Sequence, residues 1–178
     1  MITISPGHWH VGTGAVGYID EVTEARRVVN GVKYGLQKRG VACHIVVDTR
    51  SRNQRENIAY LLQAHRATTR VLDVSIHFNA SRSAEQRAIG TEVLYAQASV
   101  AELATALASR ISAAGTFICR GAKYRSDVAI LQQTGKPTVL IEVCFVNSKE
   151  DVRLYKQHFR AICEAIADTL SDYILGKI

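Results

Sequence analysis

Two histidines and a glutamate stand at or near the ends of apolar segments of this 178-residue chain. His8 comes soon after the segment Ile2–Ser5, and His77 lies near the end of the segment Arg70–Phe78. Glu142 interrupts another apolar run, where a carboxylate is costly to desolvate unless a charged or hydrogen-bonding group meets it. Each residue alone more often has a structural role. Together the three predict a metal or catalytic site.

Neutral imidazoles and a carboxylate suit a divalent ion such as Zn²⁺, and a catalytic zinc site combines three protein ligands with an open position. His8 and His77 would supply two ligands, and Glu21 or Glu24 the third. On a helical wheel, Glu21 lies within about 40° of the centre of the apolar stripe and Glu24 about 95° from it. The wheel favours Glu21 as ligand and predicts that Glu24 faces solvent. For both, the alternative is an acidic first helical turn.

A three-ligand zinc site still needs a base that takes a proton from water and passes it to the leaving group. Glu142 is the candidate, because the surrounding apolar strand would orient it and keep it only partly solvated. His10 is an alternative to His8 as ligand, or a substrate contact. His8 is favoured because it follows the turn at Pro6-Gly7.

Strand and helix signals alternate along the chain and predict an α/β fold, with a mostly parallel but mixed sheet of about six strands and helices on both faces. The expected strands are Ile2–Ser5, Val41–Val47, Arg70–Phe78, Gly90–Ala96, Val128–Gln132 and Pro137–Phe145. The expected helices run over about 20–39, 51–67, 99–115 and 148–173, with capping boxes at Ser51 and Ser99 and a cap at Ser148. In such sheets ligands bind beyond the carboxyl ends of the strands.

Composition indicates a single globular domain without a linker. The net charge of +6, from 22 Lys+Arg and 16 Asp+Glu, favours anionic partners such as cell-wall polymers. The cations are scattered, so we expect no nucleic acid partner. The four cysteines form no C-x-x-C pair and are expected to be reduced packing residues. No export signal and no membrane-spanning run is visible, and we expect a monomer.

Three sequence blocks resemble those of the zinc-dependent N-acetylmuramoyl-L-alanine amidases of the Amidase_3 type, found in bacterial autolysins and phage endolysins. They are "SPGH" at 5–8, "SIHFNA" at 75–80 and "TVLIEVCFVNSKED" at 138–151. The segment "CRGAKYRSDVAIL" at 119–131 is also similar. The resemblance covers nearly the whole chain. This sequence departs from the family pattern at Ser5, where the family usually has Asp, and at Trp9-His10, where it usually has Gly-Gly.

The resemblance implies one zinc ion held by His8, a glutamate of the segment "DEVTE" and His77, with Glu142 as catalytic carboxylate. Counting back from Gly40 without gaps selects Glu21 as the family glutamate. The implied reaction is hydrolysis of the amide between N-acetylmuramic acid and L-alanine in peptidoglycan. Residues 1–178 would form one catalytic domain without a separate wall-binding domain. An endolysin of this kind would wait in the host cytoplasm until its release to the cell wall.

Two further residues are candidates for substrate binding, and two other functions compete with the amidase. Asn79 would orient the site or only hold a turn, and Arg120 would face the glycan or the peptide. A cysteine hydrolase would use Cys144, expected on the same side of the strand as Glu142, with His77 as its base. A non-catalytic module would bind anionic wall polymer through net charge alone.

Overall fold

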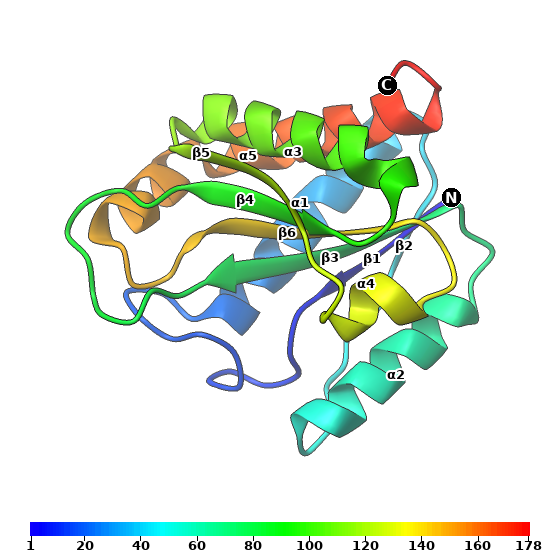
Figure 1. The fold of residues 1–178 in the computed structure, drawn as a ribbon, viewed down its shortest axis with the longest axis horizontal. Coiled ribbons are helices and arrows are strands. Elements are labelled where there is room, and N and C mark those ends of the chain that lie inside the picture. Colours follow the sequence, from blue (N-terminus) through cyan, green and yellow to red (C-terminus); the bar gives the residue numbers. More distant parts are fainter.

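The computed structural model describes residues 1–178 and has a six-stranded mixed sheet at its centre, with helices on both faces (Figure 1). The strands are β1 (Ile2–Pro6), β2 (Cys43–Ile45), β3 (Leu72–Asn79), β4 (Thr91–Tyr95), β5 (Cys119–Tyr124) and β6 (Thr138–Phe145). The helices are α1 (Glu21–Lys38), α2 (Gln54–Arg66), α3 (Ala101–Gly115), α4 (Ala129–Gln133) and α5 (Lys149–Ile174), with a 3₁₀ turn at Ala98–Val100. No helix is both long and apolar enough to cross a membrane.

The strand order β2-β1-β3-β6-β4-β5 places the three strands that carry the candidate residues side by side. β1, β3 and β6 are parallel neighbours, so their carboxyl ends reach the same edge of the sheet. β4 runs antiparallel to β6, and β5 is parallel to β4. The predicted mixed sheet with helices on both faces is therefore confirmed.

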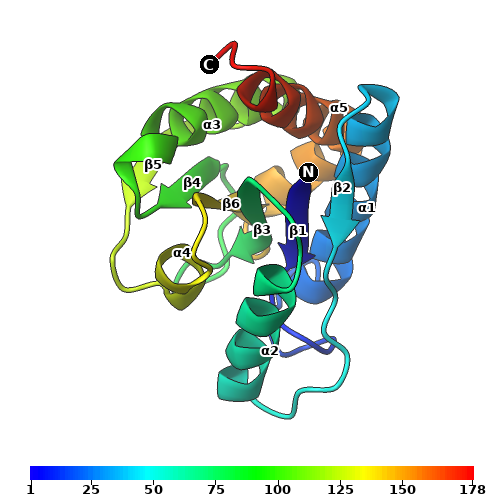
Figure 2. The same cartoon turned by 90° about the vertical axis from the view of Figure 1, so that its right-hand side faces the viewer.

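The two faces of the sheet are covered unequally. α1, α3 and α5 lie on one face, and α2 and α4 on the other (Figure 2). The three longer helices enclose the main core, a cluster of 34 buried residues that includes the inward side chains of β1, β3 and β6. α2 and α4 are held by a second cluster of only seven residues, among them Leu61, Ile130 and Leu140. This thinly covered face leaves room for a cavity beside the strand ends.

One predicted strand is a helix, and one strand was not predicted. Val128–Gln132 was expected to be a strand, but 129–133 form α4, because Ile130 and Leu131 both turn towards the second core cluster and α2. A short apolar run does not distinguish a strand from a buried helical turn. β5 has a polar sequence that gives little strand signal, and it lies at the edge of the sheet.

Only one of the three helix caps predicted from the sequence is found in the structure. Ser148 caps α5 as predicted, since its side chain accepts a hydrogen bond from the N–H of Asp151. The cap of α2 is Asn53 and not Ser51, because the Asn53 side chain reaches the N–H of Glu56. The capping box at Ser99 is wrong, since Ser99 lies inside the 3₁₀ turn and no side chain caps α3.

A buried ion pair fixes β3 near its amino-terminal end. The Asp73 carboxylate, fully shielded from solvent, accepts hydrogen bonds from Arg70 Nε and His65 Nδ1, both at 2.8 Å. Burial alone would raise the pKa of Asp73, but the hydrogen bonds from His65 and Arg70 hold it below the usual value of 3.8. The folded protein therefore binds this proton less readily than the unfolded chain.

We expect Asp73→Asn to lower the free energy of unfolding at pH 7 by roughly 3–5 kcal/mol, because it leaves a buried cation without its carboxylate. Since the folded pKa is the lower one, this contribution is complete above about pH 4 and is lost as the pH falls through the folded pKa. Urea unfolding should show a smaller difference in the free energy of unfolding between wild type and Asp73→Asn at pH 3 than at pH 7. Asp168→Asn, at an exposed pair with Arg39, should cost no more than about 1 kcal/mol. A gap that is the same at both pH values would contradict this account.

Candidate metal centre

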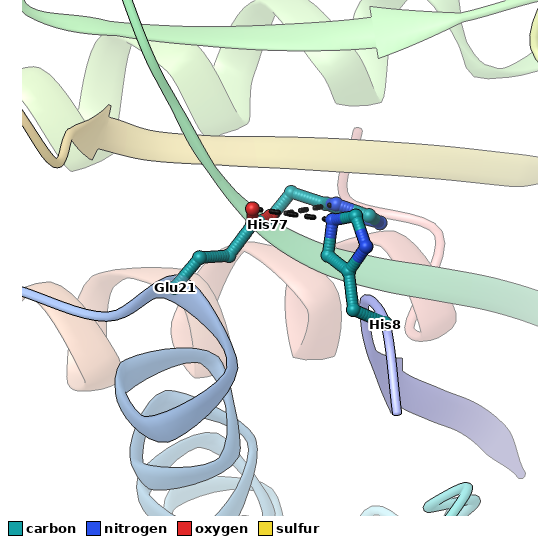
Figure 3. A group of neighbouring side chains, drawn as sticks. All are labelled: His8, Glu21 and His77. Carbon is teal, nitrogen blue, oxygen red and sulfur yellow. Dashed lines mark hydrogen bonds and ion pairs between the residues drawn. The ribbon is translucent and has the colours of Figure 1, made fainter. Parts of the chain in front are cut away.

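His8, Glu21 and His77 meet at the carboxyl edge of the sheet, although they come from three elements (Figure 3). One nitrogen of each histidine and a Glu21 oxygen all lie within 4.8 Å of one another. Glu21 Oε1 is 2.9 Å from His77 Nδ1, and Glu21 Oε2 is 3.1 Å from His8 Nε2. The two imidazole rings are 5.3 Å apart and nearly perpendicular. This is the only group of three or more potential metal ligands of these types in the structure.

Glu21 is fixed by its position as the first residue of α1. Asp20 caps the helix by accepting from the N–H of Thr23, which aims the first turn at the sheet edge. The backbone N–H groups of Phe78 and Ala15 donate to the Glu21 carboxylate, at 3.1 and 2.6 Å. Its side chain is 3% exposed, so the carboxylate cannot swing away into solvent.

His8 is held in an unusual backbone conformation. Its φ of 62° lies in the left-handed region, which non-glycine residues seldom adopt. The Asn57 side chain donates to the His8 carbonyl at 3.3 Å, and Asn57 is itself anchored by Asp48 at 2.8 Å. This conformation turns the imidazole towards Glu21.

Two glycines leave space for the cluster. A Cβ at Gly7 would lie 2.1 Å from His77 Cε1, and one at Gly14 would lie 2.6 Å from both Glu21 Oε2 and His8 Cδ2. Real Cβ atoms essentially never come so close to other heavy atoms. Any larger residue at either position would therefore have to displace one of the three candidate ligands.

His77 is oriented by contacts at both ring nitrogens. Nδ1 faces Glu21, while Nε2 is 3.1 Å from the hydroxyl of Ser75, two residues earlier on the same side of β3. A hydroxyl can donate or accept, so Ser75 can serve either tautomer of the ring. This arrangement presents Nδ1 to the centre of the cluster.

The electrostatics of the cluster favour a bound cation. Burial alone would raise the pKa of Glu21, but the hydrogen bonds from His77 and His8 and the electrostatic attraction of the two rings hold it well below the usual range. Burial alone would lower the pKa of His77, but the hydrogen bond to Glu21 and the negative charge of Glu21 raise this pKa above its usual value. The carboxylate is thus ionised and attracts positive charge to this spot.

Glu142 lies directly beside the cluster. It is the register partner of His77 across β3 and β6, and of Glu92 across β6 and β4. Its Oε2 is buried and has no hydrogen-bond partner. Burial raises the pKa of Glu142 to about 7, with Glu21 and Glu92 adding to the rise and His77 opposing it. The site therefore contains a carboxyl oxygen that no protein group occupies, on a side chain whose pKa is raised.

Asn79 and Arg120, predicted to contact substrate, are both joined to Glu92. Asn79 Nδ2 donates to Glu92 Oε1 at 3.0 Å, and Arg120 Nε donates to Glu92 Oε2 at 2.8 Å. Neither residue lines the cavity beside the histidines. Asn79 therefore has a structural contact in the free protein, and substrate binding by Asn79 and by Arg120 stays a prediction.

Neither alternative ligand predicted from the sequence, Glu24 or His10, belongs to the cluster, and a substrate contact by His10 stays a prediction. Glu24 does not face solvent as predicted, because its carboxylate is buried against the Tyr155 hydroxyl at 2.8 Å and Arg27 at 2.8 Å. The wheel placed it on the flank of α1, but α5 packs against that flank and covers it. His10 is exposed and lies outside the cluster of candidate ligands.

Cys144 does not share the face of Glu142, so the expectation from strand alternation is wrong. β3 pairs His77 with Glu142 and Asn79 with Phe145, which leaves one extra residue in β6 between the two pairs. This bulge turns both Val143 and Cys144 into the main core, on the far side of the sheet from the cavity. Burial raises the pKa of the Cys144 thiol well above its ordinary value. A cysteine nucleophile at this site is therefore not supported.

A cavity of about 330 Å³ opens beside the histidines, between the sheet and the helices α2 and α4. Sequence reasoning missed most of its lining. Ser75 could have been found by the two-residue alternation from His77. Arg125 and Asp127 lie in the segment 119–131 that resembles the family, but they were assigned no role, because their position depends on the unpredicted β5. Glu92 was missed because its closeness to Glu142 comes from antiparallel pairing of strands distant in sequence.

Comparison with known proteins places this chain in a family. The family model Amidase_3, described as N-acetylmuramoyl-L-alanine amidase, matches residues 2–172. An uncharacterized protein of Clostridium perfringens strain 13 is 32% identical over 160 residues, which cover 88% of this chain and 47% of that protein. A 38.4 kDa uncharacterized protein of C. perfringens is 30% identical over 160 residues, covering 88% and 46%. This chain thus spans about half the length of the curated relatives it matches.

Solved structures share the fold over nearly the whole chain. The catalytic domain of the CD27L endolysin, which targets Clostridia Difficile, matches with a TM-score of 0.84 and 25% identity, covering 98% of this chain and 96% of that one. The catalytic domain of CwlV, an amidase from Bacillus (Paenibacillus) polymyxa, has a TM-score of 0.82 at 21% identity and covers 97% of each chain, a likeness of fold. With the family model matching residues 2–172, this chain belongs to the Amidase_3 family of N-acetylmuramoyl-L-alanine amidases.

Proposed function

We propose that this protein is a zinc-dependent hydrolase of peptidoglycan that cleaves the amide between N-acetylmuramic acid and the L-alanine of the stem peptide. The observation that carries the proposal is the convergence of His8, Glu21 and His77 next to the unpartnered oxygen of Glu142. Membership of the Amidase_3 family supports the choice of bond.

The donor set fits zinc. Two imidazole nitrogens and one carboxylate oxygen are ligand types that catalytic zinc sites use, and three protein ligands leave a position open for water or substrate. His8, Glu21 and His77 would hold the ion. When bound, zinc supplies Lewis acidity that polarises a carbonyl group and makes water more acidic.

Glu142 then performs the proton transfers. Water adds its hydroxyl to the lactyl carbonyl carbon, while Glu142 Oε2 accepts the proton that the water loses. The carbon–nitrogen bond breaks, and Glu142 returns the proton to the alanine nitrogen, so that a carboxyl group and a free amine leave the site. The apolar strand around Glu142 keeps this carboxyl oriented, and burial keeps its affinity for protons high enough for it to act in both directions.

Identification of the products tests this function. Purified peptidoglycan sacculi incubated with the zinc-loaded protein should release material whose new amino groups belong to alanine, with no new reducing sugar ends. Labelling of free amino groups followed by hydrolysis identifies the residue, and borohydride reduction detects the sugar ends. New reducing ends would indicate a glycosidase, and new amino groups on a residue other than alanine would indicate a peptidase. Either outcome would overturn the proposal.

We further infer that the chain acts in cell lysis, as an endolysin does. The support is its similarity to the catalytic domain of the CD27L endolysin. A suspension of clostridial cells should lose turbidity on addition of the protein. Unchanged turbidity, with active hydrolysis of purified sacculi, would contradict a lytic role while leaving the amidase activity in place.

A further inference from the structure

The cavity beside the metal centre is lined by polar groups, apolar side chains and one cation. His8 and His77 line it, and Leu61, Ile130 and Leu140 supply apolar wall. Among its fourteen lining residues, Arg125 is the single arginine or lysine. A substrate that places its scissile amide at the histidines must lay its adjoining residues along this cavity. The chemistry of Arg125 then decides which substituent is accepted there.

Arg125 has a guanidinium group with one nitrogen that is left without a partner in the chain. It follows β5 directly, and its backbone N–H donates to the Tyr95 carbonyl at 2.8 Å, which anchors it to the sheet. Its Nε and Nη2 donate to the two oxygens of Asp127, each at 2.7 Å. Nη1 makes no hydrogen bond within the chain. Asp127 thus holds the guanidinium plane in place, and a guanidinium held in this way loses less entropy when it binds an anion.

We infer that Arg125 binds the α-carboxylate of the second residue of the stem peptide and makes the enzyme prefer stem peptides in which that group is free over those in which it is amidated. This inference rests on the proposed function. Two residues in extended conformation span up to about 7 Å, so the second residue of a substrate bound at the metal centre can reach into the adjoining cavity. A carboxylate gains charge-assisted hydrogen bonds from a guanidinium, whereas a neutral amide does not. Asp127 also adds negative charge beside the guanidinium. An incoming anion must therefore be placed well enough to compete with Asp127 for the hydrogen bonds of Arg125.

The test compares two synthetic substrates that differ in one group. N-acetylmuramoyl-L-Ala-γ-D-Glu-L-Lys, in which lysine is joined to the γ-carboxyl of D-Glu, carries the free α-carboxylate, and the same compound with D-isoglutamine carries the amide. For the wild type we expect kcat/KM to be about tenfold higher for the carboxylate substrate. In Arg125→Ala this ratio should fall to about one, mainly because KM for the carboxylate substrate rises.

Arg153→Ala is the matched control. Arg153 also donates from Nε and Nη2 to both oxygens of one carboxylate, that of Glu150, but it lies on α5 at the opposite face of the sheet. The Arg153→Ala variant should keep the wild-type ratio of kcat/KM between the two substrates. A ratio near one in the wild type, or the same ratio in wild type and Arg125→Ala, would overturn the inference and leave the amidase function standing. If the wild type releases alanine amino groups from neither substrate nor from sacculi, the amidase function itself falls.

Discussion

Replacing Glu142 with glutamine is expected to lower kcat for amide hydrolysis by about 10²–10⁴-fold, the usual contribution of a positioned general base. Glutamine has nearly the same shape as glutamate but cannot accept a proton from water at neutral pH. Because Glu142 is not one of the three candidate ligands, the variant should bind as much zinc as the wild type. Release of alanine amino groups from sacculi gives the rate, and mass spectrometry of the metal gives the zinc content.

Glu92→Gln is the matched control, because Glu92 is the register partner of Glu142 on β4 and is also buried. Both oxygens of Glu92 already accept hydrogen bonds, from Asn79 and Arg120, whereas Glu142 has an oxygen without a partner. We therefore expect a far smaller loss of rate in Glu92→Gln. If kcat fell equally in the two variants, the rate would depend on the negative charge of this region and not on a general base at Glu142.

The sequence was sufficient to predict that His8, Glu21 and His77 lie close together, because these residues stand at or near the ends of strands and at the start of a helix. His8 follows β1 and His77 lies near the end of β3, so the carboxyl-edge rule places both at the same edge of the sheet, and the pairing of β1 with β3 makes them neighbours. The wheel argument selected Glu21 correctly as the glutamate that faces the histidines, since the apolar stripe of α1 fixes the rotation of the helix. These inferences depend on local periodicity and on one topological rule.

The remaining errors come from long-range packing. Cys144 was placed on the wrong face because a bulge adds one residue to β6, and strand alternation cannot reveal a bulge. Glu24 was expected to face solvent because a helical wheel of α1 cannot show that α5 packs against this side and places Tyr155 next to Glu24. The place of Arg125 at the cavity could not be predicted, because it depends on β5, which the sequence pattern missed, and on α4, which was predicted to be a strand.

Zinc binding provides the second large effect, and α1 offers a matched pair of glutamates to test it. At a free zinc concentration about 100 times Kd, the wild type should gain about 2.7 kcal/mol of stability, which corresponds to a rise in Tm of roughly 5–10 °C for a chain of this size. Glu21→Gln removes one ligand charge but keeps an oxygen for the backbone N–H groups of Phe78 or Ala15. We expect its Tm to respond little to zinc, and its activity on sacculi to be lost.

Glu24→Gln should behave in the opposite way. Glu24 is buried on the same helix, three residues further on, but it contacts Tyr155 and Arg27 and not the histidines. This variant should start from a lower Tm, because its pairing with Arg27 and Tyr155 is weakened, yet gain the full shift on addition of zinc. Calorimetry with and without zinc, together with activity before and after chelation, separates the two cases. Equal zinc shifts in both variants, or full wild-type activity after the metal is removed, would exclude His8, Glu21 and His77 as the catalytic metal centre.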